Sequence, residues 1–268
     1  MTGDNLKSER TARIARFYHA EELHTQTELI LSKAASHHLV TVLRTRQGDV
    51  IELFNGDGYH YRATVTDTGQ RAPGRRAVLQ VDQRTLASTE SPVAITLVQC
   101  ISRGDRMDTT LRQAVELGVT HLQPVYSRYS ARVPDDKRMR KKQEHWHSIV
   151  VSACEQSGRA VLPGLATPST LTQWLAGKDV PDHSFVLSPT ANQSLTSHLS
   201  TLAESEEPVR RIALIIGPES GLDAEEIDLA LQAGALPTCI GPRVLRTETA
   251  GPACITLAQS ILGDLRCN

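Results

Sequence analysis

Two short polar segments hold the residues whose types and spacing could do chemistry. Residues 216–221 read IGPESG and residues 240–250 read IGPRVLRTETA, and each follows an apolar run. In both, a Gly-Pro turn permits a close backbone approach to a ligand and makes the turn rigid. The second segment also brings Arg243, Arg246 and Glu248 together, a density of fixed charge that a connecting loop does not need. Side by side, the two segments would form one site for a small polar ligand.

The first segment leads into a helix with clear start and stop signals. Asp223 and Glu226 have capping-box spacing, Ile227, Ala230 and Leu231 share a face, and Gly234 ends the helix predicted for residues 223–233. Because helix N-termini attract anions, this segment alone could bind a phosphate or a substrate carboxylate. The sequence has no P-loop lysine and no GxGxxG motif after a strand, so nucleotide-phosphate binding lacks its usual motifs.

The composition indicates one large domain or two modest ones. The chain has 268 residues, of which 40% are hydrophobic, and 29 Lys plus Arg against 30 Asp plus Glu. Any nucleic-acid surface must therefore come from local clusters of charge. Five cysteines without CxxC spacing argue against a disulfide framework or a zinc site. The N-terminal segment lacks the apolar core of a signal peptide, and no apolar run reaches membrane-span length, so we predict a cytoplasmic protein without a membrane anchor.

Residues 13–87 predict a small β-barrel after a disordered tail over residues 1–12. Strands are expected at residues 49–54, 59–66 and 77–82, with a turn at residues 55–58. Residues 36–43 predict a short helix with Leu39, Val42 and Leu43 on one face. A loop over residues 70–76 carries Arg71, Arg75 and Arg76, which either contact phosphate or are simply solvated.

Beyond a linker at residues 88–92, residues 93–268 alternate strands with helices. Asp105 can cap a helix that ends at Gly118 and has Met107, Leu111, Ala114 and Val115 on one face. Short apolar runs are typical of strands buried on both faces of a parallel sheet, and they occur at residues 93–101, 121–125, 185–187, 212–216 and 238–240. The fold class is α/β, with helices on both faces of the sheet.

A basic run, KRMRKK at residues 137–142, is predicted immediately before a helix. The apolar face of this helix comprises Trp146, Ile149, Val150, Ala153 and Cys154. Positive charge at a helix N-terminus opposes the macrodipole, so either the run contacts an anionic partner, for which RNA is our interpretation, or it is an ordinary solvated helix start. The helix ends in EQSGR at residues 155–159, where a glycine forms the cap.

Several motifs together resemble one family. They are RFY at residues 16–18, GDRMD at residues 104–108, ELGV at residues 116–119, EQSGR at residues 155–159, GPE at residues 217–219 and GPRVLRTETA at residues 241–250. The chain resembles, over residues 13–265, the bacterial 16S rRNA uridine-N3 methyltransferase family, called RsmE, within the SPOUT superfamily. The string at residues 241–250 is the specific part of the resemblance, whereas IGPESG alone is weak.

The resemblance implies a PUA-like RNA-binding barrel and a C-terminal SPOUT domain with a parallel sheet and a deep trefoil knot. It also implies a homodimer that methylates 16S rRNA of the small ribosomal subunit with S-adenosylmethionine and without a metal. The cofactor would contact Leu187, Ser188, Pro189, Ile216, Gly217, Pro218, Gly221, Ile240, Gly241, Pro242, Val244, Leu245 and Arg246. RNA would contact Arg16, Arg44, Arg71, Arg75, Arg103, Arg106, Lys137, Arg138, Arg140, Lys141 and Lys142.

For the chemistry, the resemblance leaves two choices open. Either Arg246 or Arg243 stabilises charge on the uracil carbonyls, and either Glu248 or Glu219 accepts the N3 proton. Ser220 departs from the family pattern, since a second glycine is common there. Residues 251–252 are Gly-Pro, so we expect the last helix to start late, with Pro252 in its first turn.

Three other functions compete with this interpretation. The nearest is a SPOUT ribose 2'-O-methyltransferase, against which the barrel and the RTETA string argue. A non-catalytic RNA-binding assembly factor would lack a working cofactor pocket. A metabolic enzyme would use residues 216–221 for a phosphorylated substrate and would be indifferent to RNA.

Overall fold

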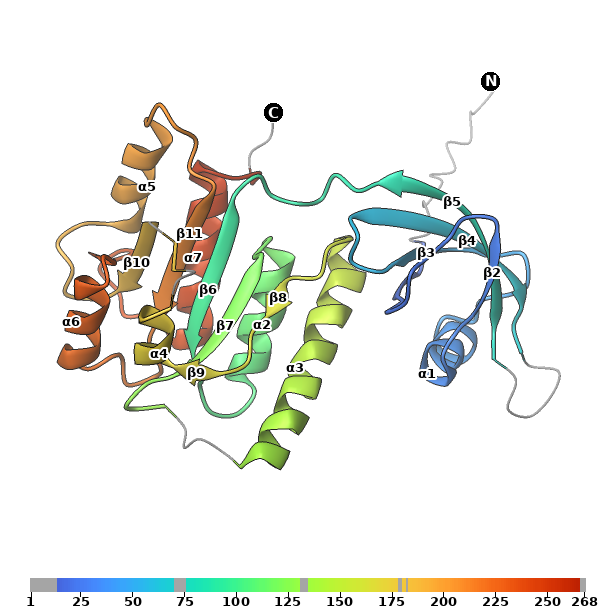
Figure 1. Ribbon diagram of the computed structural model, residues 1–268, viewed down its shortest axis with the longest axis horizontal. Coiled ribbons are helices and arrows are strands. Elements are labelled where there is room, and N and C mark those ends of the chain that lie inside the picture. Colours follow the sequence, from blue (N-terminus) through green and yellow to red (C-terminus); the bar gives the residue numbers. More distant parts are fainter. Residues whose placement is uncertain (1–13, 70–75, 131–134, 178–179, 182, 266–268) are drawn as a thin grey trace, which may run out of the picture. The chain divides into compact units, whose positions relative to one another are not determined.

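The computed structural model describes residues 14–69, 76–130, 135–177, 180–181 and 183–265. The chain divides into two compact units, Met1–Ala87 and Ser88–Asn268, which are described separately below (Figure 1). The predicted tail at residues 1–12 and the residues Arg71 and Arg75 lie outside the described residues. Among the helices of these ranges, none combines the length and apolar character that a bilayer crossing requires.

The N-terminal unit is built on a five-stranded sheet in the order β1-β3-β4-β5-β2. Its strands are β1 Arg16–Tyr18, β2 Thr27–Ile30, β3 Val50–Phe54, β4 Tyr59–Asp67 and β5 Val78–Leu86. All neighbours pair antiparallel except β1 with β3. Alternate residues of β4, including Tyr61, Ala63 and Val65, are buried in the core of this unit, as the period-2 pattern predicts. The three strands predicted here are confirmed as β3, β4 and β5.

The helix predicted for residues 36–43 is wrong in its start and in its apolar face. The chain forms α1 Lys33–His37, whose start is capped by the Ser32 hydroxyl, followed by a π-helical turn η1 His38–Val42. The wider turn, closed by a bond from the Leu43 amide to the His38 carbonyl, changes the angular spacing of the side chains. Leu39 is therefore buried, while Val42 and Leu43 are exposed.

The C-terminal unit is built on an all-parallel sheet in the order β12-β10-β11-β6-β7-β8, with β9 pairing to β7 (Figure 1). The strands are β6 Ala94–Cys100, β7 His121–Tyr126, β8 Gly164–Leu165, β9 Ser169–Thr170, β10 His183–Leu187, β11 Arg211–Ile216 and β12 Leu236–Thr238. The strand expected at residues 238–240 ends earlier, because Cys239 pairs with the residue 193–195 segment instead. Parallel strands place their carboxyl ends at one edge, where ligands bind in such sheets.

Helices cover both faces of this sheet, which confirms the predicted α/β class. They are α2 Arg106–Glu116, α3 Asp136–Ser157, α4 Leu171–Leu175, α5 Leu195–Ala203, α6 Ala224–Gln232 and α7 Thr247–Ile261. On one face, Val98 and Cys100 of β6 share a core with Leu171 of α4 and Ala230 of α6. On the other, α7 lies against Leu97, and α2 and α5 pack against α7. The trefoil knot stays a prediction.

Two helix starts differ from the sequence-based expectation. The basic run at residues 137–142 lies inside α3, because Asp135 caps the helix by accepting a bond from the Arg138 amide. The last helix, α7, begins at Thr247, so Pro252 lies inside it and not in its first turn. At this start the amides of Thr249 and Ala250 both donate to the Arg246 carbonyl. Proline lacks an N–H, so this start costs the helix one bond, to the Glu248 carbonyl.

The EQSGR segment is a structural element of this unit. Gly158 adopts φ 89° and caps α3. Arg159 is buried, forms an ion pair of 2.6 Å with Glu90, and donates to the carbonyls of Val115 and Val119 at 3.1 and 2.7 Å. The guanidinium thus joins the start of the unit to the end of α2.

Candidate active site

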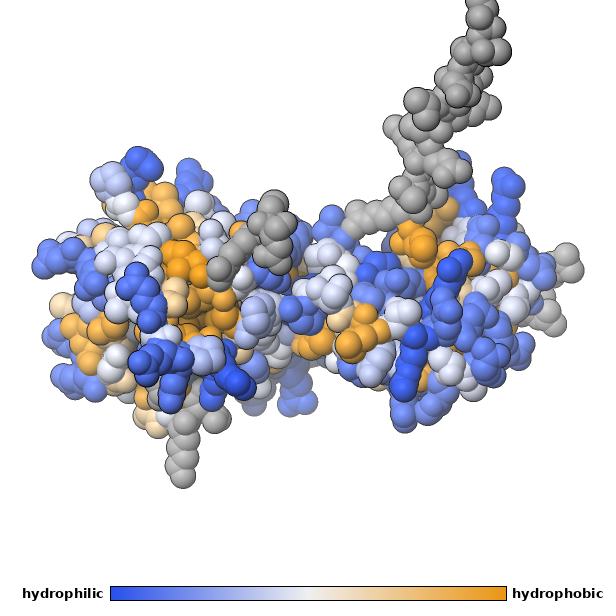
Figure 2. Space-filling model, turned by 90° about the horizontal axis from the view of Figure 1, so that it is seen from above, coloured by the Kyte–Doolittle hydropathy of each residue, from blue (hydrophilic) through white to orange (hydrophobic). Residues whose placement is uncertain are grey.

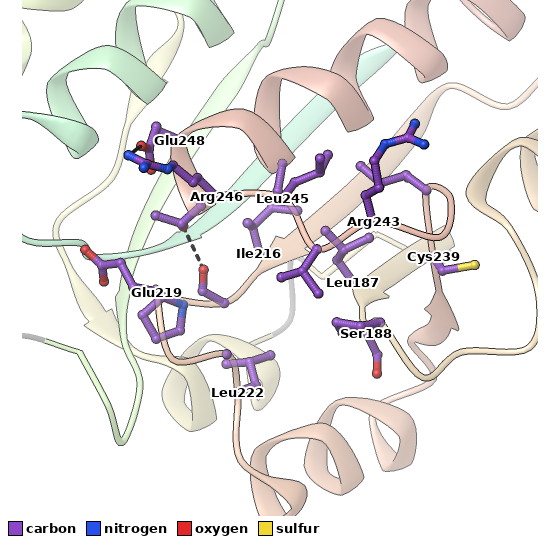
Figure 3. A pocket seen from close by; sticks show the side chains of 18 of the residues that line it. Leu187, Ser188, Ile216, Glu219, Leu222, Cys239, Arg243, Leu245, Arg246 and Glu248 are labelled. Atoms are coloured by element: carbon purple, nitrogen blue, oxygen red, sulfur yellow. Dashed lines mark hydrogen bonds and ion pairs between the residues drawn. The ribbon is translucent and has the colours of Figure 1, made fainter.

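A cavity of about 380 Å³ lies at the carboxyl ends of β10, β11 and β12 (Figure 3). Its walls are the loop after β10, the loop after β11, the loop between β12 and α7, and the first turn of α7. The two Gly-Pro segments therefore lie side by side, which is the arrangement in which they would form one site. Ligand pockets of small molecules start at about 300 Å³, so the cavity can hold a ligand of nucleoside size.

Nearly all the residues expected at a cofactor line this cavity, and Pro242 is the exception. Those brought together are Leu187, Ser188, Pro189, Ile216, Gly217, Pro218, Gly221, Ile240, Gly241, Val244, Leu245 and Arg246. The lining also contains Ile227, Cys239, Thr247 and Ala250, which were not expected at the cofactor. Thr247 and Ala250 were missed because the expected late start of the last helix removed them from its first turn. Cys239 and Ile227 carry no signal in the sequence that marks them as lining residues.

One part of the cavity is apolar. Leu187, Ile216 and Leu245 surround a common space in Figure 3, and Leu222 closes it from the α6 side. The loop after β11 is tight, since a Cβ at Gly217 would lie 3.0 Å from the Leu222 nitrogen. Such a wall offers an apolar slot bounded by backbone groups, which suits the adenine and methionine parts of a nucleoside cofactor.

The opposite end of the cavity is charged. Glu219 accepts hydrogen bonds from the Arg103 amide, at 3.2 Å, and from the Arg106 guanidinium. Arg106 also lies 3.9 Å from Glu248, which lies 3.9 Å from Arg246 in turn. Arg106, expected among the RNA contacts, thus lines the cavity and connects the two carboxylates that were candidates for the base.

The two carboxylates differ in their surroundings. Burial raises the pKa of Glu219, but hydrogen bonds from its own amide, the Arg103 amide and the Arg106 guanidinium outweigh burial and hold that pKa below its usual value. Glu219 is therefore a charged acceptor that already has its donors, which makes it a poor proton acceptor. The Glu248 side chain is 18% exposed, and within the described part of the chain its Oε2 has no hydrogen-bond partner.

The two arginines lie at different ends. Figure 3 shows Arg246 beside Glu248, whereas Arg243 lies near Cys239 and Ser188 on the far side of the cavity. The Arg246 side chain is 80% exposed, and its one ion pair within the described ranges is the 3.9 Å pairing with Glu248, so it can turn toward an incoming substrate.

The arginines and lysines expected to contact RNA are scattered, and the structure brings only some of them together. Arg16 pairs with Glu52 at 2.9 Å and lies over the Phe54 ring, while Arg44 and Arg103 are exposed. On α3, Lys137, Arg138, Arg140 and Lys141 are exposed along the first turns. Lys142 lies 4.9 Å from the Trp146 ring, and burial lowers the pKa of this lysine. No group of three or more potential metal ligands occurs among the described residues.

The fold and the site together define a class of protein. The family described as RNA methyltransferase domain matches residues 89–259, and the family described as RNA methyltransferase PUA domain matches residues 31–72. The C-terminal unit is thus an RNA methyltransferase domain, and the N-terminal unit contains a PUA domain.

Individual relatives narrow this class to a family. The ribosomal RNA small subunit methyltransferase E of Buchnera aphidicola is 32% identical over 94% of this chain and 98% of its own. That of Neisseria gonorrhoeae, solved bound to S-adenosylmethionine, is 34% identical with a TM-score of 0.82, covering 94% of this chain and 100% of its own. A Legionella pneumophila methyltransferase solved with the same cofactor is also 34% identical, with a TM-score of 0.84 and the same coverage. The chain belongs to the ribosomal RNA small subunit methyltransferase E family.

Proposed function

We propose that this chain transfers the methyl group of S-adenosylmethionine to N3 of a uridine in 16S rRNA of the small ribosomal subunit. The observation that carries the proposal is the cavity, whose apolar slot lies beside a cluster of two arginines and two glutamates. The two relatives solved with S-adenosylmethionine support the choice of cofactor.

The apolar slot and the Gly-Pro loops would hold the cofactor. When bound, it supplies an electrophilic methyl group on a sulfonium. The slot would exclude water, and its backbone groups would fix the adenine and methionine ends. The charged cluster lies at the other end of the same cavity, so a uracil placed there would meet both Arg246 and Glu248 (Figure 3).

The charged cluster would accept the N3 proton of the uracil and stabilise the negative charge that its loss creates. N3 carries a proton that must leave as the N3–methyl bond forms, and Glu248 is the acceptor because Glu219 is held by its donors. As this proton leaves, negative charge develops on the uracil carbonyls, and Arg246 would stabilise it until N3 takes up the methyl group. Arg243 lies too far from Glu248 to share this role and would contact the cofactor side.

Substrate binding would involve both units of the chain. We assign RNA binding to residues 13–87, catalysis to residues 93–268, and additional phosphate contacts to the exposed basic first turns of α3. The target uridine must leave its stack to reach the cavity. Assembled small subunits are the natural substrate on this view, and we place the protein in the cytoplasm with them.

A homodimer is part of the proposal. Ala253, Leu257 and Ile261 form a half-buried stripe on α7, and Figure 2 shows a band of apolar surface on the C-terminal unit. Such surface on a single chain is typical of an interface. Light scattering of the purified protein, with Leu257→Glu as the disrupting variant, measures the association.

Mass-spectrometric mapping of 16S rRNA tests the reaction. Small subunits from a strain lacking the gene are incubated with the protein and S-adenosylmethionine, and the nucleosides are then analysed. We expect one uridine to gain a methyl group on its base. A methyl group on a ribose would favour the 2'-O-methyltransferase, and calorimetry without heat on addition of the cofactor would favour the assembly factor.

A further inference from the structure

A buried glutamine occupies the middle of the parallel sheet. Gln99 lies on β6, between β11 and β7, and is 1% exposed. Strands in this position are apolar on both faces, and a buried amide is costly unless it is hydrogen-bonded. Its Oε1 has no hydrogen-bond partner among the described residues, so Gln99 is not fully satisfied. The residue type therefore calls for an explanation other than stability.

The amide of Gln99 begins a hydrogen-bond chain that ends in the cavity wall. Gln99 Nε2 donates to the Thr247 hydroxyl at 2.9 Å and to the Cys100 carbonyl at 3.2 Å. The Thr247 hydroxyl, on a residue that is 4% exposed, donates to the Gly217 carbonyl at 2.8 Å. Because the hydroxyl accepts one bond and donates one, its orientation is fixed at both ends.

These hydrogen bonds connect three parts of the fold that are distant in sequence. They are the central strand β6, the first residue of α7 and the first residue of the loop after β11. The connection requires α7 to lie very close to the sheet, and Gly251 allows this, since a Cβ there would meet Gln99 Oε1 at 3.1 Å and Leu97 at 3.4 Å. The close approach and the hydrogen-bond chain thus belong to one arrangement.

We propose that Thr247 and Gln99 are positioning residues that hold the loop at residues 217–221 in its cofactor-binding shape. This inference rests on the proposed function only in taking the cavity as the S-adenosylmethionine site. Gly217 directly precedes the turn at residues 218–221, which the Gly221 amide closes by donating to the Pro218 carbonyl at 2.9 Å. Holding the Gly217 carbonyl therefore fixes the whole turn and the wall of the cavity before the ligand arrives, which reduces the ordering cost of binding.

Two matched substitutions of Thr247 test the proposal. Thr247→Val removes the hydroxyl at nearly constant volume, and Thr247→Ser keeps it. We expect Thr247→Val to weaken S-adenosylmethionine binding about tenfold in calorimetry, equivalent to about 1.4 kcal/mol, and Thr247→Ser to change it less than about twofold. Gln99→Met, which removes the donor from the other end of the chain, should weaken binding in the same direction and should add little to Thr247→Val in the double variant.

Hydrogen–deuterium exchange of the ligand-free protein gives an independent readout. The amides of residues 217–222 should exchange faster in Thr247→Val than in the wild type, and Thr247→Ser should match the wild type. Val150→Ala, in the buried face of α3, serves as the control for general destabilisation. It should lower Tm without altering the hydrogen bonds that join Gln99, Thr247 and Gly217. It should leave both the cofactor affinity and the local exchange unchanged.

The outcomes separate this inference from the proposed function. Wild-type affinity and wild-type exchange in Thr247→Val would overturn it, as would equal effects of Val150→Ala. If the wild type bound no S-adenosylmethionine while Thr247→Val still loosened residues 217–222, the cofactor assignment would fail and the positioning role would stand.

Discussion

Replacing Glu219 and Glu248 in turn by glutamine separates the two carboxylates at the charged end of the cavity. In Glu219→Gln the side-chain oxygen can still accept from the Arg103 amide and from Arg106, so only the charge is lost. The Glu219 side chain is 31% exposed, and ion pairs this open to solvent contribute about 1 kcal/mol or less. We therefore expect a Tm lower by about 2–4 °C and a kcat within about tenfold of the wild type.

The lowered pKa of Glu219 also predicts in which direction its contribution to stability changes with pH. The folded-state pKa of Glu219 is held below the ordinary value of 4.5, so the carboxylate contributes stability above that value and loses it as pH falls through the folded pKa. The difference in unfolding free energy between wild type and Glu219→Gln should be fully present at neutral pH. It should vanish in acid, where both side chains are neutral. Denaturant unfolding at a series of pH values measures it.

Glu248→Gln should behave differently. If Glu248 accepts the N3 proton, its loss should lower kcat about 10²- to 10⁴-fold, the usual contribution of a general base. Cofactor affinity should change little, because Glu248 lies at the charged end of the cavity (Figure 3). Single-turnover methylation of small subunits with labelled cofactor measures both variants. A hundredfold loss in Glu219→Gln together with near wild-type rates in Glu248→Gln would refute the division of roles.

Three further substitutions have defined outcomes. Gly118→Ala should destabilise the protein by about 2 kcal/mol more than Gly104→Ala in denaturant unfolding, because both positions have positive φ but only the Cβ at residue 118 would lie 2.6 Å from Gln259. Arg159→Met should lower the unfolding free energy by about 3–5 kcal/mol, since it leaves a carboxylate and two carbonyls without their buried donor; a loss below 1 kcal/mol would contradict this. Arg246→Ala should lower kcat about 10²-fold with little change in RNA affinity by filter binding, and the reverse pattern would assign it to RNA binding.

The parts of the site that local sequence determines were predictable. Gly-Pro turns, the capping box of α6 and the apolar strand β11 before the first turn depend on neighbouring residues, and the structure has them in place. The strand before the second turn ends earlier than predicted, at Thr238, and is largely exposed. Together they were enough to bring residues 216–221 and 240–250 to one cavity. The parallel sheet was also predictable, because short continuous apolar runs are typical of strands buried on both faces of such a sheet.

Contacts between distant segments were not predictable in this way. Arg106 and Glu219 are 113 residues apart, and in the sequence Arg106 is one of several arginines that could contact phosphate. The same holds for Arg159, since a buried arginine that binds a carboxylate and two carbonyls is indistinguishable in sequence from an exposed one. Only the fold determines which charges neutralise each other and which remain for a substrate.

The start of α7 connects these findings. If α7 began late enough for Pro252 to lie in its first turn, Thr247 and Glu248 would lie in the preceding loop. Because α7 begins at Thr247 instead, Glu248 occupies the first turn, where the partial positive charge of the helix N-terminus favours a carboxylate. The same start places the Thr247 hydroxyl between Gln99 and Gly217. The main-chain bond that Pro252 cannot make is therefore offset by contacts that build both walls of the cavity, which explains why a proline is compatible with this helix.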